Sequence, residues 1–313
     1  LISSLEKKRV GFSVKNGHVD SLCLSSKLFK SIPNCFNDLP YVRELVVEKT
    51  QITALPSSIG RLKRLTILRL GKNEIETIPP EIGNAESIEE IFLQYNRLKC
   101  LPNAIGELFR LKKLNLMDNL ITVIPNTLGN CRNLQEIVLK RNHLPSVPAS
   151  VLQIKSLNVF DASKNDITSF PDSFSPQSKL ELLDLSENQI SHLPRSITKL
   201  SQLKMLDASE NDMENCPHAL GDAQSLIVLN LQGNYLSFLP RSIGQLKHLE
   251  ILDVSKNRLS FVPESIGKLS SLKTLDLSHN QLEFLPESIV KLEKIENINV
   301  SANPWKYPPL EIA

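Results

Sequence analysis

Asparagine recurs at a fixed interval of 23 residues along most of this chain. It occupies eleven positions from Asn73 to Asn303 without a slip, and proline recurs at the same interval at thirteen positions from Pro33 to Pro309. So strict a period predicts thirteen short repeats stacked in one direction, each of which contacts only its neighbours. No single repeat can bury its apolar side chains alone, so we expect the array to fold as one solenoid.

The clearest repeats read L-x-x-L-x-L-x-x-N-x-L-x-x-L-P-x-x-I-G-x-L-x-x, as in residues 249–271, and positions 1 to 23 are counted from the first leucine. Alternating leucines at positions 4 and 6 predict a short strand, and stacking predicts a parallel sheet with strands about 4.8 Å apart on the concave side. The asparagine at position 9 can pair with backbone groups that the following turn leaves unmatched. The proline at position 15 begins the convex side, where no ladder bond is lost. The expected fold is an α/β solenoid with a parallel concave sheet and a convex side of irregular, 3-10 and short helical segments.

The chain ends depart from the repeat and predict caps. Residues 1–18 contain an Asn-Gly turn signal and predict a hairpin that covers the first strand edge. Residues 19–302 hold twelve full repeats and the start of the thirteenth, and residues 303–313 form its capping end. The repeat is also broken at residues 174–179, where its glycine and second leucine are missing, and a local irregularity is expected there. Because the chain starts at Leu1 without methionine, we expect it to be a piece of a longer protein.

Composition narrows the classes of partner and compartment. The formal net charge is only +2, so no global field favours nucleic acid or an anionic membrane. No apolar run approaches the roughly 20 residues that a membrane span requires, so no membrane insertion is expected. The five cysteines are odd in number and do not cluster at either end, which favours a reducing compartment. A cytoplasmic, monomeric solenoid is therefore expected.

Signatures of catalysis and of cofactor binding are missing from the sequence. It contains no glycine-rich phosphate loop, no G-K-[ST], no C-x-x-C and no H-x-x-x-H, and its six histidines fall at unrelated repeat positions. Catalytic groups must converge on a pocket, whereas a solenoid of this kind offers an open curved face. We therefore expect a protein that is not an enzyme and has no catalytic residues, no cofactor and no metal site.

The repeats resemble the Ras-group leucine-rich repeats. The segment LPRSIGQL at residues 239–246 and the ending NPWKYPPLEI at residues 303–312 are similar to that group, and the resemblance covers residues 19–313. The group includes the Ras–Raf scaffold family, the Scribble, Erbin and Densin proteins, plant intracellular Ras-group proteins and repeats of Roco kinases. The resemblance implies a leucine-rich-repeat horseshoe whose concave sheet engages signalling proteins such as small GTPases or phosphatase subunits.

Candidate binding residues occupy the outward positions 2, 3, 5, 7 and 8, because the inward positions report only the fold. In repeats one to six these positions hold a mixture of aromatic, methionine, valine and basic residues, which is typical of interface anchors. They include Val46, Arg69, Phe92, Tyr95, Met117, Val138, Lys140 and Arg141. Nothing in the fold requires an aromatic residue at position 5, so Phe92 is the strongest single candidate. The alternative interpretation is an isolated exposed apolar residue, which is ordinary on any surface.

From repeat seven onward the outward positions become acidic. Counted over the five outward positions, repeats seven to thirteen hold ten acidic and four basic residues, against seven and eight in repeats one to six. Position 5 carries Asp161, Asp184, Asp207, Asp253 and Asp276, with asparagine in the two remaining repeats. Like charges on adjacent strands repel, so a row of aspartates suggests docking of a basic partner surface. The alternative is framework, in which the carboxylates meet neighbouring hydroxyls and amides.

An apolar stripe at position 3 runs beside the aspartates and also has two interpretations. It consists of Val159, Leu182, Met205, Val228 and Ile251. The stripe forms either a groove wall that packs partly under its neighbours or an exposed binding ridge.

Three functions remain open from the sequence. The leading hypothesis is an intracellular scaffold that holds one or two signalling proteins on its concave face. The second is the recognition domain of a larger enzyme, such as a kinase, phosphatase, cyclase or Roco GTPase. The third, a cell-surface or host-directed recognition protein, would carry a secretion signal or cysteine caps, and the sequence shows neither.

Overall fold

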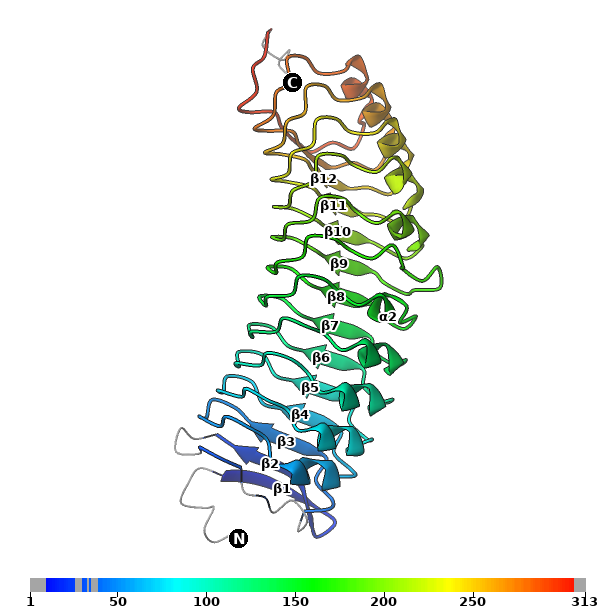
Figure 1. Cartoon of the computed structure of the whole chain (residues 1–313). Coiled ribbons are helices and arrows are strands. Elements are labelled where there is room, and N and C mark those ends of the chain that lie inside the picture. Colours follow the sequence, from blue (N-terminus) through cyan, green and yellow to red (C-terminus); the bar gives the residue numbers. More distant parts are fainter. Residues whose placement is uncertain (1–9, 26–29, 33, 35–38, 307–313) are drawn as a thin grey trace. The chain divides into compact units, whose positions relative to one another are not determined.

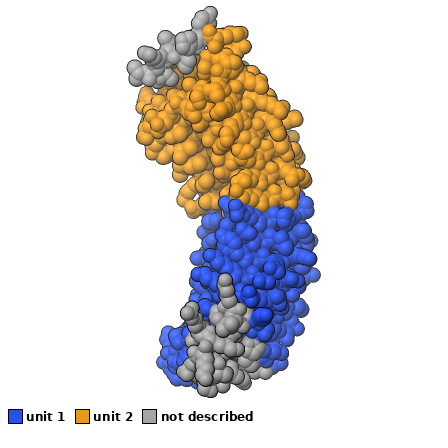
Figure 2. Space-filling model, turned by 90° about the vertical axis from the view of Figure 1, so that its left-hand side faces the viewer, with its two compact units in different colours: residues 1–160 blue, residues 161–313 orange. Residues whose placement is uncertain are grey.

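The structure is a computed structural model that describes residues 10–25, 30–32, 34 and 39–306. It divides into two compact units, residues 1–160 and 161–313 (Figure 2). In each unit short parallel strands lie on one side and short helical turns on the other (Figure 1). The predicted solenoid with a parallel sheet is confirmed by this arrangement.

The first unit begins with an antiparallel hairpin of β1 (Val10–Lys15) and β2 (His18–Leu24). Its turn is formed by Asn16 and Gly17, which both have positive φ angles of 51° and 79°. Strand β2 pairs in parallel with the next strand as well, so it connects the antiparallel hairpin to the parallel sheet. The cap predicted over residues 1–18 therefore shares its second strand with the sheet, and residues 1–9 of that prediction lie outside the described residues.

The remaining strands of the first unit pair in parallel in chain order, each shifted by one repeat from the last. They are β3 (Glu44–Val47), β4 (Ile67–Arg69), β5 (Glu90–Phe92), β6 (Lys113–Asn115) and β7 (Glu136–Val138), and β8 (Val159–Asp161) spans the boundary of the units. The opposite side carries the 3-10 helices η3 (Ser57–Arg61), η4 (Pro80–Asn84), η5 (Asn103–Glu107) and η6 (Asn126–Asn130), and the α-helix α2 (Ala149–Leu152).

The second unit repeats the same construction. Its parallel strands are β9 (Leu182–Asp184), β10 (Met205–Asp207), β11 (Val228–Asn230), β12 (Ile251–Asp253), β13 (Thr274–Asp276) and β14 (Asn297–Asn299). Its 3-10 helices are η7 (Arg195–Lys199), η8 (His218–Asp222), η9 (Arg241–Gln245), η10 (Glu264–Lys268) and η11 (Glu287–Lys291). A proline precedes each of these helices at its N-cap, where no ladder bond is needed.

Each regular repeat buries the same set of apolar positions. In the repeat that starts at residue 111 the buried side chains are Leu111, Leu114, Leu116, Ile121, Ile124, Leu128 and Cys131. In the strand only the middle residue is buried, so its two neighbours face outward. This alternation fixes which side chains the sheet presents to a partner.

The asparagine at position 9 joins each repeat to the one before it. The Asn119 side chain is buried, and its Nδ2 donates to the carbonyl of Leu116 in its own repeat and to that of Leu93 in the preceding repeat, at 2.9 and 3.0 Å. Its Oδ1 accepts from the backbone N–H of Leu98 at 3.1 Å. One side chain therefore satisfies three buried backbone groups that the turn would otherwise leave unpaired.

The residue just before this asparagine adopts a left-handed conformation in repeat after repeat. Position 8 has positive φ from Lys49 to Ala302, with Tyr95 at 59°, and only Gly233 is a glycine there. Side chains are thus tolerated in a region of φ that they seldom adopt. The hydrogen bonds of the asparagine that follows hold the backbone of this turn in place.

The glycine at position 19 lets successive repeats approach closely on the helical side. A Cβ atom on Gly106 would overlap the backbone carbonyl of Thr127, and one on Gly244 would overlap that of Ser265. Both contacts join a glycine to the small residue at position 17 of the next repeat. Glycine is required here for space rather than for its φ angle.

The irregularity predicted at residues 174–179 is confirmed, because no helical turn forms in this repeat. Phe170 and Phe174 fill the core instead, with their rings stacked at 5.9 Å. Ser196 of the next repeat ties the segment down, since its N–H donates to Asp172 Oδ1 at 2.5 Å and its hydroxyl accepts from the N–H of Phe174 at 3.1 Å. The hydrogen bond from the Ser196 N–H lowers the pKa of Asp172, and a side-chain hydrogen bond from Ser196 lowers it further. Local polar contacts thus replace the helix.

Substitution of Asn119 tests the asparagine ladder. Asn119→Ala leaves three buried backbone groups without partners, so we expect the free energy of unfolding to fall by about 2 to 4 kcal/mol. Urea unfolding followed by circular dichroism measures this change. The control is Asn103→Ala, which alters an exposed asparagine in the same unit and should shift stability by less than about 0.5 kcal/mol. Equal effects of the two substitutions would contradict the role given to the ladder.

Candidate protein-binding surface

The outward positions of the parallel strands form the candidate binding surface, named here the strand face. In the first unit its centre is a row at position 5 on adjacent strands. Strand register places Val46 beside Arg69 and Arg69 beside Phe92, and the row continues through Asn115 to Val138. All five side chains are half-buried. The structure therefore brings together four of the predicted residues, and adds Asn115, which sequence reasoning did not single out.

Arg69 links Glu44 to Phe92 across three strands, and these three residues are named here the anchor. The Arg69 guanidinium carbon lies 4.4 Å from the centre of the Phe92 ring, and its Nε lies 3.3 Å from Glu44 Oε1. A guanidinium over an aromatic face contributes about 0.5 to 1 kcal/mol at an exposed site. The ion pair orients the guanidinium, and the guanidinium in turn restricts the Phe92 ring. Glu44 was missed in the sequence because its partner lies 25 residues away.

A second tier of predicted residues lies where the strands end and the asparagine turns begin. Tyr95 is 41% exposed, and Lys72 Nζ lies 5.5 Å from its ring centre. Arg141 is also exposed and forms an ion pair of 3.4 Å with Asp118. Met117 and Lys140 are half-buried at position 7 of their repeats. The first unit thus presents an aromatic and apolar row beside a tier that is rich in bases.

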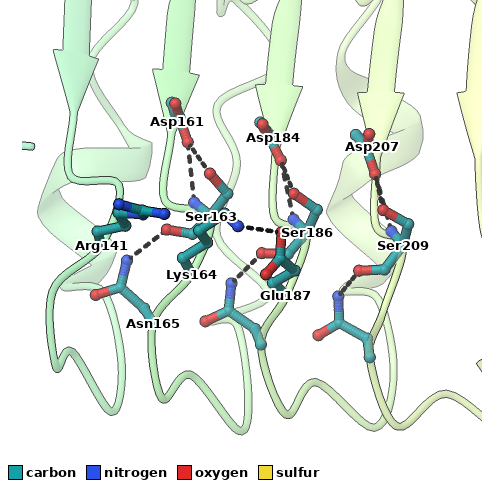
Figure 3. Close-up of polar contacts among 12 residues, drawn as sticks. Arg141, Asp161, Ser163, Lys164, Asn165, Asp184, Ser186, Glu187, Asp207 and Ser209 are labelled. Carbon is teal, nitrogen blue, oxygen red and sulfur yellow. Dashed lines mark hydrogen bonds and ion pairs between the residues drawn. The ribbon is translucent and has the colours of Figure 1, made fainter. Parts of the chain in front are cut away.

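In the second unit the strand face carries the Asp row, which consists of Asp161, Asp184, Asp207, Asp253 and Asp276. Each carboxylate accepts a hydrogen bond from the backbone N–H of the residue two positions later. Figure 3 shows this contact for Asp161, Asp184 and Asp207. Asp184 Oδ1, for example, lies 2.9 Å from the N–H of Ser186 and 2.6 Å from its hydroxyl. The framework interpretation is thus correct for one oxygen of each carboxylate.

The second oxygen differs along the row. Asn230 Nδ2 donates to Asp207 Oδ2 at 3.0 Å, and Asn299 Nδ2 donates to Asp276 Oδ2 at 2.9 Å. In the part of the chain that the structure describes, Oδ2 of Asp161, Asp184 and Asp253 receives no such hydrogen bond. These three oxygens face outward and are available to donors of a partner.

The acidic excess of the second unit is concentrated on the Asp row. The bases at outward positions of this unit each pair with a glutamate: Lys164 with Glu187, Lys204 with Glu181, Lys256 with Glu210 and Lys273 with Glu250. Within the described ranges no Lys or Arg lies at ion-pair distance from an aspartate of the row. Exposed ion pairs contribute little to stability, but here they leave the five aspartates and Glu296 as the uncompensated charge.

Burial and neighbouring like charges act together on Asp184, the second member of the row. Partial burial raises the pKa of Asp184, and the neighbouring Asp161 and Asp207 raise it further, while the hydrogen bonds from Ser186 oppose both effects. The charged form of Asp184 is therefore disfavoured in the folded protein relative to the unfolded chain.

The position-3 stripe has features of both the partly packed groove wall and the exposed ridge. Val159 in the first unit and Leu182, Met205 and Val228 in the second are half-buried, whereas Ile251 is 40% exposed. The stripe packs partly under its neighbours and still adds apolar surface beside the Asp row.

Of the four cysteines within the described ranges, only Cys23, in β2, lies on the strand face. Cys23, Cys100, Cys131 and Cys216 are free thiols. Burial raises the pKa of Cys131 and of Cys216 to about 12, so both behave as small core residues. Among the described residues no group of three or more His, Cys, Asp or Glu could hold a metal ion. None of the helices described is long and apolar enough to cross a bilayer.

The chain matches a known family of repeat proteins. The family model described as Leucine rich repeat matches residues 63–121, 155–213 and 247–304, and a second model of the same description matches residues 225–246. A search of curated proteins gives no significant match.

Solved structures of similar fold include a bacterial leucine-rich repeat protein and two receptors. A leucine-rich repeat protein of Leptospira interrogans is 30% identical with a TM-score of 0.74, over 90% of this chain and 78% of its own. A TDR receptor is 29% identical with a TM-score of 0.80, over 91% and 52%. The plant peptide hormone receptor RGFR1, in complex with RGF2, is 27% identical with a TM-score of 0.77, over 91% and 51%. The chain spans about half the length of these two receptors.

Replacing Asp184 by asparagine tests the electrostatics of the Asp row. Asparagine keeps an acceptor for Ser186 and can donate to Asp161 Oδ2, as Asn230 does to Asp207. We expect Asp184→Asn to raise the free energy of unfolding at pH 7 by about 0.5 to 1 kcal/mol, because it removes repulsion between adjacent strands.

The pH dependence follows from the raised pKa of Asp184. The folded state holds this proton more tightly than the unfolded state, so the destabilisation by the charged form is complete above the folded pKa and vanishes below the unfolded pKa. The gain from Asp184→Asn should therefore shrink as pH falls from 7 through the folded pKa, as measured by urea unfolding at several pH values. Asp222→Asn, at an exposed site outside the row, is the control and should show no such trend. A gain that does not change with pH would refute the electrostatic explanation.

Proposed function

The chain belongs to the leucine-rich repeat family, and on that premise we propose that it is an intracellular scaffold that binds signalling proteins through its strand face. The proposed partners are of the small GTPase or phosphatase class. Leucine-rich repeat proteins are typically binding domains without enzymatic activity, and we propose no catalytic role here. The anchor of the first unit is the observation that carries this proposal.

The anchor has the chemistry of an interface hot spot. Arginine and aromatic residues dominate the binding energy of protein interfaces, and a side chain held in place before binding loses less entropy on association. Arg69 and Phe92 hold each other across adjacent strands, and Glu44 holds Arg69. The half-buried Val46 and Val138 extend apolar surface along the same row.

The Asp row supports a second contact zone for a basic partner surface. Three of its carboxylates present an outward oxygen without a hydrogen-bond donor in the described structure, and the bases of the same face are paired with glutamates. Charge complementarity of this kind chiefly raises the association rate and selects partners. The apolar stripe beside the row supplies contact area.

The partner class and the compartment rest on separate observations. The partner class is taken from the resemblance of the repeats, such as residues 239–246, to the Ras-group. The cytoplasmic location is supported by the free thiols, two of which occupy core positions. We also propose that the chain acts as a monomer.

A second candidate function is the recognition domain of a larger enzyme, such as a kinase, phosphatase, cyclase or Roco GTPase. It is favoured by the two receptor structures, each about twice the length of the matched region, one of which is a peptide hormone receptor in complex with RGF2. Sequence that flanks this chain in the genome distinguishes this candidate from a free-standing scaffold.

The anchor is tested with the double variant Arg69→Ala/Phe92→Ala. Immobilised chain is titrated with purified small GTPases in their GTP and GDP forms and with phosphatase catalytic subunits. Two hot-spot residues correspond to about two orders of magnitude in Kd, so the variant should weaken binding by about that factor.

The matched control is Phe109→Ala/Arg132→Ala, which removes one aromatic and one arginine at exposed positions away from the strands of the same unit. It should bind like the unmodified chain. Loss of binding in both variants, or in neither, would contradict a role for the anchor. Binding of neither protein class by the unmodified chain would contradict the proposed partners.

The Asp row predicts that affinity depends on salt. Screening shortens the reach of charges to about 8 Å at 0.15 M salt and about 3 Å at 1 M. The Kd of the partner should therefore rise steadily between low and high salt, and the rise should be smaller for the Asp161→Asn/Asp253→Asn variant. An affinity that does not change with salt would show that the Asp row serves only the framework.

A further inference from the structure

A row of three phenylalanines, two of them exposed, lies on the second unit at a repeat position outside the strands. The Phe row consists of Phe238, Phe261 and Phe284, which share position 13 in three successive repeats. Phe261 and Phe284 are 54% and 53% exposed, and Phe238 is half-buried. Position 13 holds small or polar residues in most other repeats, so the fold does not require aromatic residues there.

Residues at position 13 of adjacent repeats lie side by side. In the first unit parallel bridges join Ala54 to Thr77 and Cys100 to Val123 at this position. The same repeat geometry aligns the Phe row along one flank of the second unit, between the asparagine turns and the 3-10 helices. Aligned aromatic residues form a continuous apolar stripe rather than scattered exposed residues.

A hollow with a basic rim adjoins the Phe row. It is lined by Phe261, Val262 and Pro263 and by residues of η9, η10 and η11. Three of its four charged lining residues are bases, namely Arg241, Lys268 and Lys291, and the fourth is Glu264. The Glu264 carboxylate accepts a hydrogen bond from the N–H of Ser288 at 3.1 Å. No carboxylate of the described residues lies at ion-pair distance from the three bases.

Two serine hydroxyls in this hollow lack hydrogen-bond partners within the described structure. They belong to Ser265 and Ser288, and only 5% of Ser288 is exposed. A buried hydroxyl without a partner is unfavourable unless a ligand or solvent completes it. The hollow therefore combines an apolar wall, three cations and two hydroxyl groups.

We propose that this flank of the second unit is a docking site for an acidic peptide segment that carries a large apolar side chain. The apolar side chain packs against Phe261 and Phe238, and a carboxylate of the peptide lies among Arg241, Lys268 and Lys291. Charge complementarity selects this occupant, because a basic segment would meet three like charges. The site is independent of the strand face and extends the proposed scaffold to a second kind of partner.

A displayed library of random twelve-residue peptides, selected on the immobilised full chain, tests the proposal. Selected peptides should be enriched in Asp or Glu next to Phe, Leu, Ile or Trp. Their synthetic versions should bind the Phe261→Ala variant and the Lys268→Glu variant at least tenfold more weakly than the unmodified chain.

Matched controls separate this site from the rest of the molecule. Val123→Ala alters an exposed residue at the same repeat position in the first unit, and Lys155→Glu reverses an exposed charge there. Neither should change peptide binding, and Arg69→Ala/Phe92→Ala should leave it intact even if that variant loses the strand-face partner. Circular dichroism melting checks that every variant is folded.

Three outcomes would overturn the proposal. Selected peptides without acidic enrichment would remove the charge argument. Peptides that lose binding only in the strand-face variant would place the site there. A concentration-dependent dimer in sedimentation equilibrium that Phe261→Ala abolishes would show that a second copy of the chain covers the Phe row instead.

Discussion

The side-chain amide of one asparagine per repeat is the interaction on which the rest of the structure depends. Asn119 bonds to backbone groups of its own repeat and of the repeat before it, and the same geometry recurs at Asn142 and Asn211. Because the bonds of Asn119 to Leu93 and Leu98 reach into the preceding repeat, the ladder fixes the register of the neighbouring strands. Fixed register in turn decides which side chains share the strand face. Replacement of any one of these asparagines therefore removes hydrogen bonds in two repeats.

Because the asparagine ladder and the buried apolar positions determine the fold, the outward positions of the strands can vary. Core positions stay apolar and are mainly leucine and isoleucine. Position 5, by contrast, holds Val46, Arg69 and Phe92 on successive strands of the first unit and mostly aspartate in the second. The aspartates both stabilise the framework and present charge on the surface. One carboxylate oxygen bonds to the turn that follows, and the other oxygen of Asp161, Asp184 and Asp253 points outward. A residue type that looks like framework can thus also present charge to a partner.

The sequence predicted the fold well because its signals are periodic and local. The spacing of asparagine and proline placed the strands, the turns and the 3-10 segments, and the missing glycine near Phe174 marked the repeat without a helix. The stacking of Arg69 on Phe92 and its ion pair with Glu44 depend on rotamers and on contacts across strands, which spacing does not encode. The Phe row was missed although it also recurs every 23 residues, because its importance depends on exposure and on the cations of a neighbouring hollow. The raised pKa of Asp184 likewise arises from burial and from neighbours on adjacent strands.

The repeat without a helical turn shows where this architecture tolerates a change of backbone conformation at constant length. Residues 171–179 abandon the helix, yet Asn188 in the next repeat still reaches back to the carbonyl of Ala162 at 3.0 Å. The connection on this side of the repeat can therefore be rebuilt without disturbing the asparagine ladder, since Ser196 and two stacked phenylalanines suffice to hold it. Substitutions or grafted segments of equal length are accordingly best accommodated at this connection. A single residue added between a strand and its asparagine would instead misalign the hydrogen bonds of two repeats.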